Sequence, residues 1–262
     1  MTTDASRNAP DGASDGASDA SVDATAEIAA RIRANLAAVQ GRIAEAAAAA
    51  GRDASEITLV AVTKYAQMPW VRALLAEGIV DLGENRPQQL AERQPVLGEA
   101  IRWHLIGTLQ RNKVGLVLDT IPNGLIHSVD SVRLGRRIRK LAADRPRPDP
   151  MRPTRVLLQV NVTGEASKQG LEPGDVAAAI DELASESLQI DGLMTMAAVR
   201  TAADDDGPRR AFDTLRRLRD DCASAAVPLP ILSMGMSGDF EDAIAAGATH
   251  LRVGSTLFDG CQ

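Results

Sequence analysis

Short apolar runs alternate with amphipathic stretches along most of the chain. Eight of these runs are rich in aliphatic and β-branched residues and have the length of buried strands. Amphipathic stretches lie between them, with apolar positions three or four residues apart, as in helices that pack one face on a sheet. The predicted strands are residues 58–63, 79–83, 102–107, 124–129, 155–162, 189–194, 230–235 and 250–254.

Helical periodicity is clearest in five of the stretches between strands and in one stretch before the first strand. The N-terminal stretch, residues 26–51, is rich in helix formers, and Gly51 stands where a C-cap is expected. Residues 87–100 and 109–120 show a weaker pattern, and residues 201–210 are interpreted as a loop. The other predicted helices are residues 68–78, 130–143, 174–186, 209–225 and 239–248.

Strand and helix in regular alternation imply parallel strands with right-handed crossovers. Eight such units in 262 residues match a closed barrel, which typically needs about 250 residues. We therefore predict the α/β class, with a single (β/α)8 barrel of the TIM type over residues 26–262. The proline-rich stretch 145–153 is interpreted as a connection inside this barrel. Because the chain stops soon after the last predicted strand, we expect no second domain, and the N-terminal helix to take the place of the missing final helix.

Composition and charge limit the partners and the cellular compartment that we expect for the protein. Residues 1–25 carry five Asp against one Arg and no apolar run, which predicts a disordered acidic tail. The tail accounts for most of the net charge of -6, and the near-neutral remainder argues against nucleic-acid or membrane partners. The two cysteines, Cys222 and Cys261, are too few for a disulfide framework, so we expect a reducing cytoplasm.

In a barrel of this type the functional face is the rim formed by the C-terminal ends of the strands. Only four of the 29 basic residues are lysines, and one of them, Lys64, directly follows the first strand. Desolvation at a barrel mouth favours the neutral amine of a lysine, which is the form that makes a Schiff base. The residues predicted at the rim are Lys64, Asn85, His104, Ser128, Asn161, Met194, Ser237 and Arg252.

Glycine-rich turns follow the seventh and eighth predicted strands. Ser237 is expected to cap the next helix, and Gly254 and Ser255 form the second turn, in the loops where barrel proteins commonly bind a phosphate. Asp239 has the wrong charge for a phosphate, so we expect it to point away. A Schiff-base lysine opposite a phosphate site suits pyridoxal 5'-phosphate (PLP), and it would also suit an aldolase acting on a phosphosugar.

Arg252 lies two residues before Gly254. Its guanidinium would donate to the pyridine nitrogen of PLP and leave that nitrogen unprotonated, which weakens the ring as an electron sink; a phosphate or carboxylate is the alternative partner. The three histidines lack metal-site spacing, so we expect His104 near the cofactor and His127 and His250 in structural roles. Lys168, on the loop after the fifth strand, is a second candidate for the aldehyde.

Eight motifs, in order, resemble those of the PLP homeostasis proteins, single-domain barrels similar to the N-terminal domain of alanine racemase and to fold type III PLP proteins. The resemblance implies PLP on Lys64, its phosphate on Ser237, Gly254 and Ser255, Arg252 at the ring nitrogen and Asn85 beside the ring. It also implies a role in PLP and vitamin B6 balance with little or no catalysis, and PLP-dependent apoenzymes as partners. The motifs are AVTKYAQ, LGENRPQQL, WHLIGTLQRNK, IHSVDS, QVNVTGEASKQGL, DGLMTMA, LSMGMSGDFEDAI and LRVGSTLFDG.

The chain departs from the family pattern around this site. Tyr65 follows the lysine where the family usually has Thr, Arg86 replaces an aromatic residue, and the closing Phe-Gly-x-Arg becomes residues 258–261, FDGC. The alternative function is an amino-acid racemase, which would need a tyrosine from a second domain on the face of the substrate opposite the lysine. The single tyrosine, Tyr65, lies beside Lys64, which disfavours that alternative. Monomer and weak dimer are both compatible with the sequence.

Overall fold

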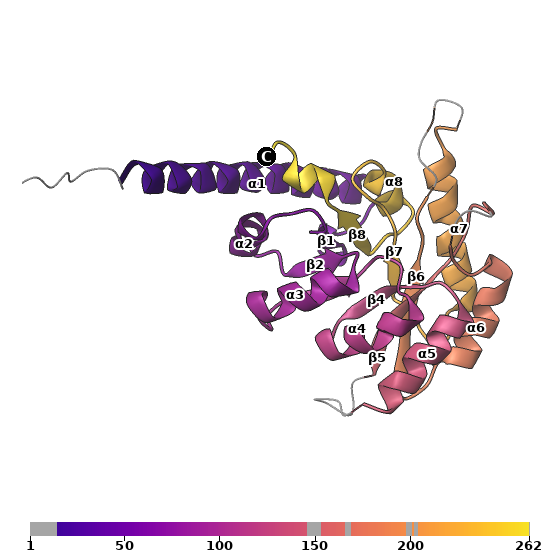
Figure 1. Cartoon of the computed structure of the whole chain (residues 1–262). Helices are drawn as coiled ribbons and strands as arrows, with labels where there is room; N and C mark the ends of the chain where they lie inside the picture. The colour runs from indigo at the N-terminus through magenta and orange to yellow at the C-terminus, as the bar shows by residue number, and fades with distance from the viewer. Residues whose placement is uncertain (1–14, 146–152, 166–168, 198–200, 202–203, 262) are drawn as a thin grey trace, which may run out of the picture.

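In the computed structural model, eight parallel strands close into one barrel in chain order, with β1 pairing with β8 (Figure 1). The structure describes residues 15–145, 153–165, 169–197, 201 and 204–261. All eight predicted strands are confirmed, with ends that differ by a few residues. The strands are β1 (Thr58–Val62), β2 (Asp81–Glu84), β3 (Arg102–Leu105), β4 (Leu125–Val129), β5 (Thr154–Gln159), β6 (Leu188–Met194), β7 (Ile231–Ser233) and β8 (His250–Val253).

Helices cover the outside of the barrel (Figure 1). The weakly patterned residues 87–100 and 109–120 both contain helices. Helix α7 begins inside the predicted loop 201–210, because Pro208 in its first turn favours a helix start. The α-helices are α1 (Asp15–Ala49), α2 (Met68–Ala76), α3 (Pro87–Leu97), α4 (Val114–Thr120), α5 (Val132–Ala143), α6 (Val176–Leu183), α7 (Gly207–Cys222) and α8 (Phe240–Ala245). Short 3-10 helices are η1 (Ala54–Glu56), η2 (Arg111–Lys113), η3 (Pro173–Asp175) and η4 (Ser255–Phe258).

Helix α1 begins at Asp15 rather than at residue 26, so the predicted boundary of the tail is wrong. Residues 15–25 contain three alanines, and alanine is the best helix former, so this acidic sequence can extend the helix. Residues 1–14 lie outside the described residues, and their disorder stays a prediction. Most of the connection 145–153 also lies outside them. Gly51 follows the helix with φ +67°, in the left-handed conformation expected of a C-cap.

The N-terminal helix closes the outer layer, as predicted. It packs against α2, α8 and η4, beside the strand pair β1 and β8. Its buried stripe repeats every three or four residues, through Ile32, Leu36, Val39 and Ile43. The Asn35 amide Nδ2 donates to the carbonyls of residues 257 and 259 at 3.2 and 2.9 Å. Helix α1 thereby fixes the segment that follows β8.

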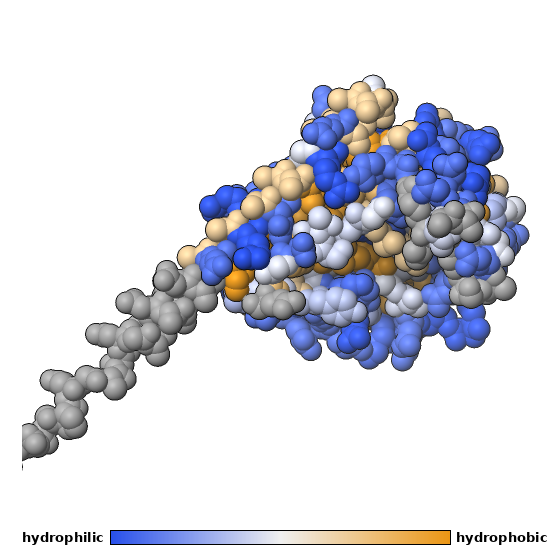
Figure 2. All heavy atoms as spheres, turned by 90° about the horizontal axis from the view of Figure 1, so that it is seen from above, coloured by the Kyte–Doolittle hydropathy of each residue, from blue (hydrophilic) through white to orange (hydrophobic). Residues whose placement is uncertain are grey.

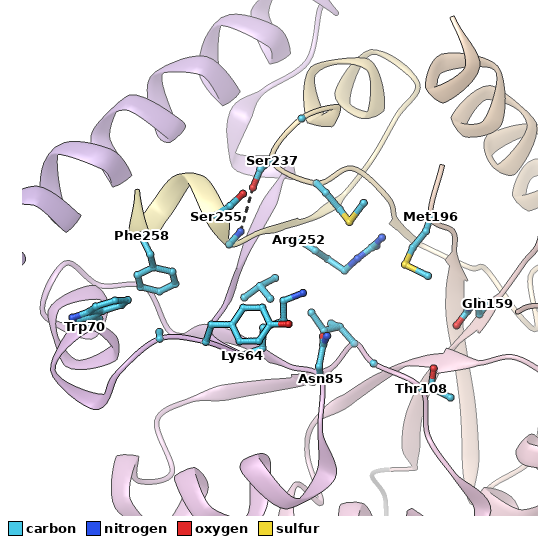
Figure 3. A pocket seen from close by; sticks show the side chains of 18 residues that line it. Lys64, Trp70, Asn85, Thr108, Gln159, Met196, Ser237, Arg252, Ser255 and Phe258 are labelled. Atoms are coloured by element: carbon cyan, nitrogen blue, oxygen red, sulfur yellow. Dashed lines mark hydrogen bonds between the residues drawn. The ribbon is translucent and has the colours of Figure 1, made fainter. Parts of the chain in front are cut away.

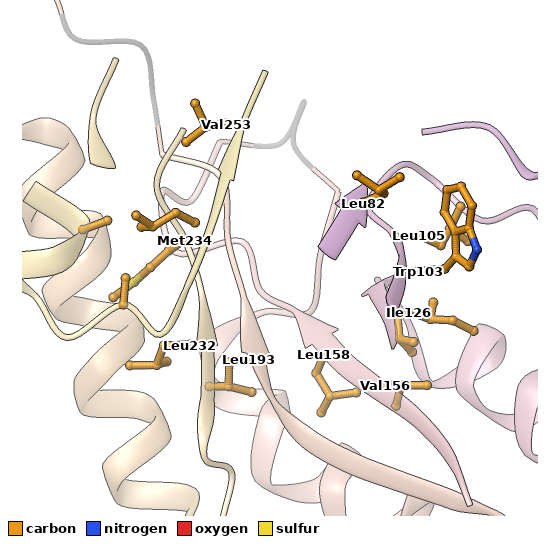
Figure 4. Close-up of a cluster of buried hydrophobic side chains, with 14 of the residues drawn as sticks. Leu82, Trp103, Leu105, Ile126, Val156, Leu158, Leu193, Leu232, Met234 and Val253 are labelled. Atoms are coloured by element: carbon orange, nitrogen blue, oxygen red, sulfur yellow. The ribbon is translucent and has the colours of Figure 1, made fainter. Parts of the chain in front are cut away.

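The main apolar core lies between the strands and the helices around them (Figure 4). Outward-facing strand residues such as Leu82, Leu158 and Leu232 belong to it. A separate small cluster fills one layer of the barrel interior, from Leu125, Leu157, Met194 and Ile231. The surface seen from above is largely polar (Figure 2). No helix in the described part of the chain is long and apolar enough to cross a bilayer.

Candidate functional site

A cavity of about 710 Å³ opens at the C-terminal ends of the strands (Figure 3). Its volume lies within the ~300–1,000 Å³ that is usual for small-molecule sites. The cavity brings together six of the ten residues predicted from the sequence, contributed by the first two and the last two strand ends. They are Lys64, Asn85, Ser237, Arg252, Gly254 and Ser255.

Lys64 follows β1 in a turn that helix α3 holds by its backbone. The Gln89 amide Nε2 donates to the Lys64 carbonyl at 3.0 Å. The Arg93 guanidinium donates to the carbonyl of Thr63 at 2.8 Å and to that of Ala66. The carbonyls before, at and two residues after the lysine are therefore all bound, which fixes the point where its half-buried side chain enters the cavity.

Arg93 is itself paired with Glu84, whose side chain is fully buried at the end of β2. The Thr63 hydroxyl also donates to Glu84, at 2.5 Å. Burial raises the pKa of Glu84, although the bonds from Thr63 and Arg93 act in the opposite direction. A buried carboxylate is stable only when it is paired and hydrogen-bonded. Glu84 and Arg93 thus form one unit that supports the turn of Lys64.

The turns after β7 and β8 meet at the other side of the cavity. The backbone N–H of Gly254 points to the Ser237 hydroxyl at 3.4 Å, and Ser255 lies beside them (Figure 3). Ser237 does not cap helix α8, contrary to the prediction. Asp239 is the N-cap residue, and its carboxylate accepts from the N–H of Met236 at 2.6 Å. With Asp239 at the cap, the Ser237 hydroxyl faces the turn after β8.

Arg252 on β8 reaches the cavity from inside the barrel. Its guanidinium donates to the Ser233 hydroxyl at 2.6 Å and to the Thr195 carbonyl at 2.9 Å. Burial lowers the pKa of Arg252 to about 10, although the charge of Asp239 opposes that shift. Among the described residues, no carboxylate forms an ion pair with Arg252. With five N–H donors, Arg252 keeps donors for an acceptor in the cavity.

Four predicted rim residues do not line the cavity. His104 and Met194 point into the barrel one layer below it, where Met194 belongs to the small inner cluster. The Ser128 hydroxyl donates to the carbonyl of Gly107 at 2.6 Å, so it supports a lining residue. Asn161 closes its own turn by donating to the carbonyl of Glu165 at 3.0 Å. Lys168, the alternative lysine, lies outside the described residues.

The strand ends do not lie at one height, which explains these errors. On β3 and β6 the lining residues come two positions later, at Ile106 and Met196, and on β5 two positions earlier, at Gln159. Steps of two keep a side chain on the same face of a strand and move it by one layer. The alternation was therefore predictable, whereas the height of each strand in a tilted barrel is not visible in one sequence.

Aromatic side chains form one wall that sequence reasoning missed. The rings of Trp70 and Phe258 lie 5.8 Å apart between centroids, next to the turn of Ser255. Tyr65 also lines the cavity but is 82% exposed, and its ring centroid lies 5.0 Å from the Lys64 Nζ. The chain has only six aromatic residues of these types, so their scarcity was a usable signal.

Comparisons with known proteins find relatives that match most of the chain. Residues 29–261 match the family model of the alanine racemase N-terminal domain. A pyridoxal phosphate homeostasis protein of Pseudomonas aeruginosa is 39% identical, covering 85% of this chain and 93% of that protein. One from Deinococcus radiodurans is 40% identical, covering 84% and 98%. The solved structure of PipY of Synechococcus elongatus with PLP bound is 32% identical, with TM-score 0.67, and covers 82% of this chain and 99% of that one.

Proposed function

The chain belongs to the pyridoxal phosphate homeostasis protein family, and from that membership we propose that it holds PLP as a Schiff base on Lys64. Its role is PLP homeostasis, and so vitamin B6 balance, with little or no catalysis. A cytoplasmic location and the hand-over of PLP to apoenzymes are parts of the same proposal. One observation carries it: a single cavity contains a lysine, a buried arginine and two serine-bearing turns.

These side chains fit three of the polar groups of PLP, namely the aldehyde, the phosphate and the ring nitrogen. The amine of Lys64 suits the aldehyde: a C=N bond forms between Nζ and the aldehyde carbon, and one water molecule leaves. The hydroxyls of Ser237 and Ser255 suit the phosphate. A Cβ added at Gly238 would meet nothing within 4 Å, so this turn leaves open space beside Ser237. The buried guanidinium of Arg252 suits an acceptor with a lone pair, such as the ring nitrogen.

The same residues favour retention of PLP over turnover. When bound, PLP supplies an electron-accepting ring, which is strongest when the ring nitrogen is protonated. Arg252 can only donate to that nitrogen, so it would leave the nitrogen unprotonated. The sole tyrosine, Tyr65, lies beside Lys64 and not across the cavity from it. Fast, Lys64-dependent racemisation of alanine, serine or lysine by the purified protein would contradict this part of the proposal.

Absorption spectra test the attachment directly. We expect the purified protein, or the protein reconstituted with PLP, to absorb visible light as a PLP Schiff base, and the band to disappear on borohydride reduction. Lys64→Ala should lose both the band and the irreversible trapping of PLP. The matched control is Lys140→Ala, which removes an exposed lysine of the outer helix α5 and should keep both. PLP trapping by Lys64→Ala at the wild-type level would refute the proposal.

A further inference from the structure

All three histidines of the chain lie together inside the barrel, below the cavity. Their ring centroids are 5.1 to 6.4 Å apart, although His104, His127 and His250 are far apart in sequence. This cluster is not visible in the sequence, because its members come from three different strands. No group of three histidine, cysteine or acidic side chains in the described parts of the chain is arranged to hold a metal ion. The cluster therefore needs another explanation.

Two of the histidines belong to a continuous row of hydrogen bonds. From Arg252 the row passes to the Ser233 Oγ at 2.6 Å, and from Ser233 to the His127 Nδ1 at 2.8 Å. The His127 Nε2 lies 2.9 Å from the His104 Nδ1, and the His104 Nε2 lies 3.1 Å from the Asp81 Oδ1. Every member of the row is buried. It runs from the cavity through the barrel interior to the start of β2.

The two ends of the row fix the direction of its first and last bonds. Arg252 can only donate, and an ionised Asp81 can only accept. Although burial would raise it, hydrogen bonds from His104 and Arg102 lower the pKa of Asp81 to about 2, so Asp81 is ionised at neutral pH. Burial, followed by the nearby positive charges, holds the pKa of His127 well below its usual value, so His127 is neutral.

With one proton on each histidine, a single arrangement satisfies all of these conditions. His104 then carries its proton on Nε2 and donates it to Asp81, so its Nδ1 accepts from the Nε2–H of His127. The His127 Nδ1 then accepts the Ser233 hydroxyl proton, and the oxygen of Ser233 is left to accept from Arg252. The guanidinium thus meets a hydroxyl oxygen whose own proton points away from it. This orientation depends on the negative charge at the far end of the row.

We propose that Asp81 is a positioning residue for Arg252, acting through His104, His127 and Ser233 as a directional hydrogen-bond relay. The relay holds the guanidinium in one place and orientation at the floor of the cavity. The effect on bound PLP rests on the proposed function, because it requires Arg252 to face the ring nitrogen. The relay itself does not, since all of its bonds exist in the protein alone.

Other charged groups at the same end of the barrel do not replace Asp81. Arg102 binds Asp81 from outside, with its Nε 2.8 Å from Oδ1 and a largely exposed side chain, so it helps to keep the carboxylate ionised. His250 forms its hydrogen bond with its neighbour Thr249, and burial together with His104 lowers the pKa of His250 to about 4. The titratable and charged groups in the relay or facing it are Asp81, Arg102, His104, His127, Arg155, Asp239, His250 and Arg252.

Nitrogen-15 NMR of the histidine rings in PLP-free protein tests the relay, first in the wild type and then in two variants. We expect His104 and His127 both to be Nε2–H tautomers with an unprotonated Nδ1 near neutral pH. In Asp81→Asn this single arrangement should be lost and the two rings should show mixed tautomers. The matched control is Asp191→Asn, which removes another buried carboxylate, paired with Arg155, that has no hydrogen bond to the relay. It should keep the wild-type tautomers.

The spectrum of bound PLP supplies the second measurement. With Arg252 held in place, we expect the visible band of the wild type and of Asp191→Asn to stay constant between about pH 6 and 8. In Asp81→Asn the band should change across this range, with PLP still attached to Lys64. The relay would be overturned if His104 or His127 were an Nδ1–H or mixed tautomer in the wild type. It would also be overturned if Asp81→Asn kept the wild-type tautomers and spectra. Absence of PLP on Lys64 alongside the expected tautomers would refute the proposed function instead.

Discussion

At the scale of single residues, the position of Lys64 depends on Arg93, which binds the backbone of its turn. Arg93 binds two backbone carbonyls of the Lys64 turn and the buried carboxylate of Glu84. Such an arginine cannot be replaced by lysine without loss, because one planar group serves three acceptors. The position of Lys64 in the cavity is therefore set from helix α3.

We expect Arg93→Met to destabilise the protein by about 3 kcal/mol, because it leaves Glu84 buried without its partner. It should also reduce the fraction of protein that retains PLP after gel filtration. Urea unfolding of the PLP-free protein measures the first effect separately from the second. The control is Arg136→Met, which breaks an exposed pair with Glu182 and should cost no more than about 1 kcal/mol. Equal losses in the two variants would contradict this account.

The sequence alone singled out six residues that the structure brings together in one cavity. The sequence pointed to Lys64, Arg252 and the serine turns. An amine, a guanidinium and phosphate-type turns at one rim are typical of a site for a phosphorylated aldehyde. Glu84 and Arg93 could not be chosen, since their role depends on a contact between β2 and α3 that no local pattern records. The histidine cluster was missed for the same reason.

At the scale of elements, the strand and helix pattern was predictable because period and length alone specify it. The heights of the strands were not, and this decided which side chains reach the cavity. Gly107 shows how closely neighbouring strand ends approach. A Cβ added there would lie 2.2 Å from the carbonyl oxygen of Asn85, which is far closer than any real contact. The ends of β2 and β3 can meet only because residue 107 has no side chain.

Gly107→Ala should therefore displace the Asn85 backbone and weaken PLP binding, at a cost in stability of about 1–3 kcal/mol from overpacking. Urea unfolding and PLP titration measure the two effects. Gly41→Ala is the matched control, because a Cβ there would meet nothing within 4 Å on helix α1. That variant should gain about 0.5–1 kcal/mol from helix propensity. Full PLP affinity in Gly107→Ala would show that the approach of the two strand ends does not shape the site.

At the scale of the whole molecule, the barrel encloses ionisable groups that make its stability depend on pH. The folded-state pKa values of His127 and His250 lie below the ordinary value of 6.5, so below this pH the unfolded chain binds protons that the folded chain refuses. The contribution of these two histidines to stability therefore falls as the pH falls. Asp81, whose pKa is about 2, contributes stability above its ordinary value of 3.8 and loses it only in stronger acid.

Between pH 7 and 5 we expect the free energy of unfolding to drop by about 2 kcal/mol from His250 alone, given its pKa of about 4. His127 adds to this drop. Urea unfolding at the two pH values measures it, and His250→Gln should make the drop smaller, because glutamine does not titrate. A wild type equally stable at pH 7 and 5 would show that these histidines are not held neutral in the folded barrel.

The most direct test of the central claim is to locate the covalent bond. The protein is loaded with PLP, reduced with borohydride and digested, and the modified peptide is identified by mass spectrometry. We expect one modified residue, Lys64, in the peptide that follows β1. Modification of Lys168, or of the exposed Lys140 to the same extent, would contradict it, because the arginine and the serine turns proposed to receive the ring and the phosphate line the cavity of Lys64.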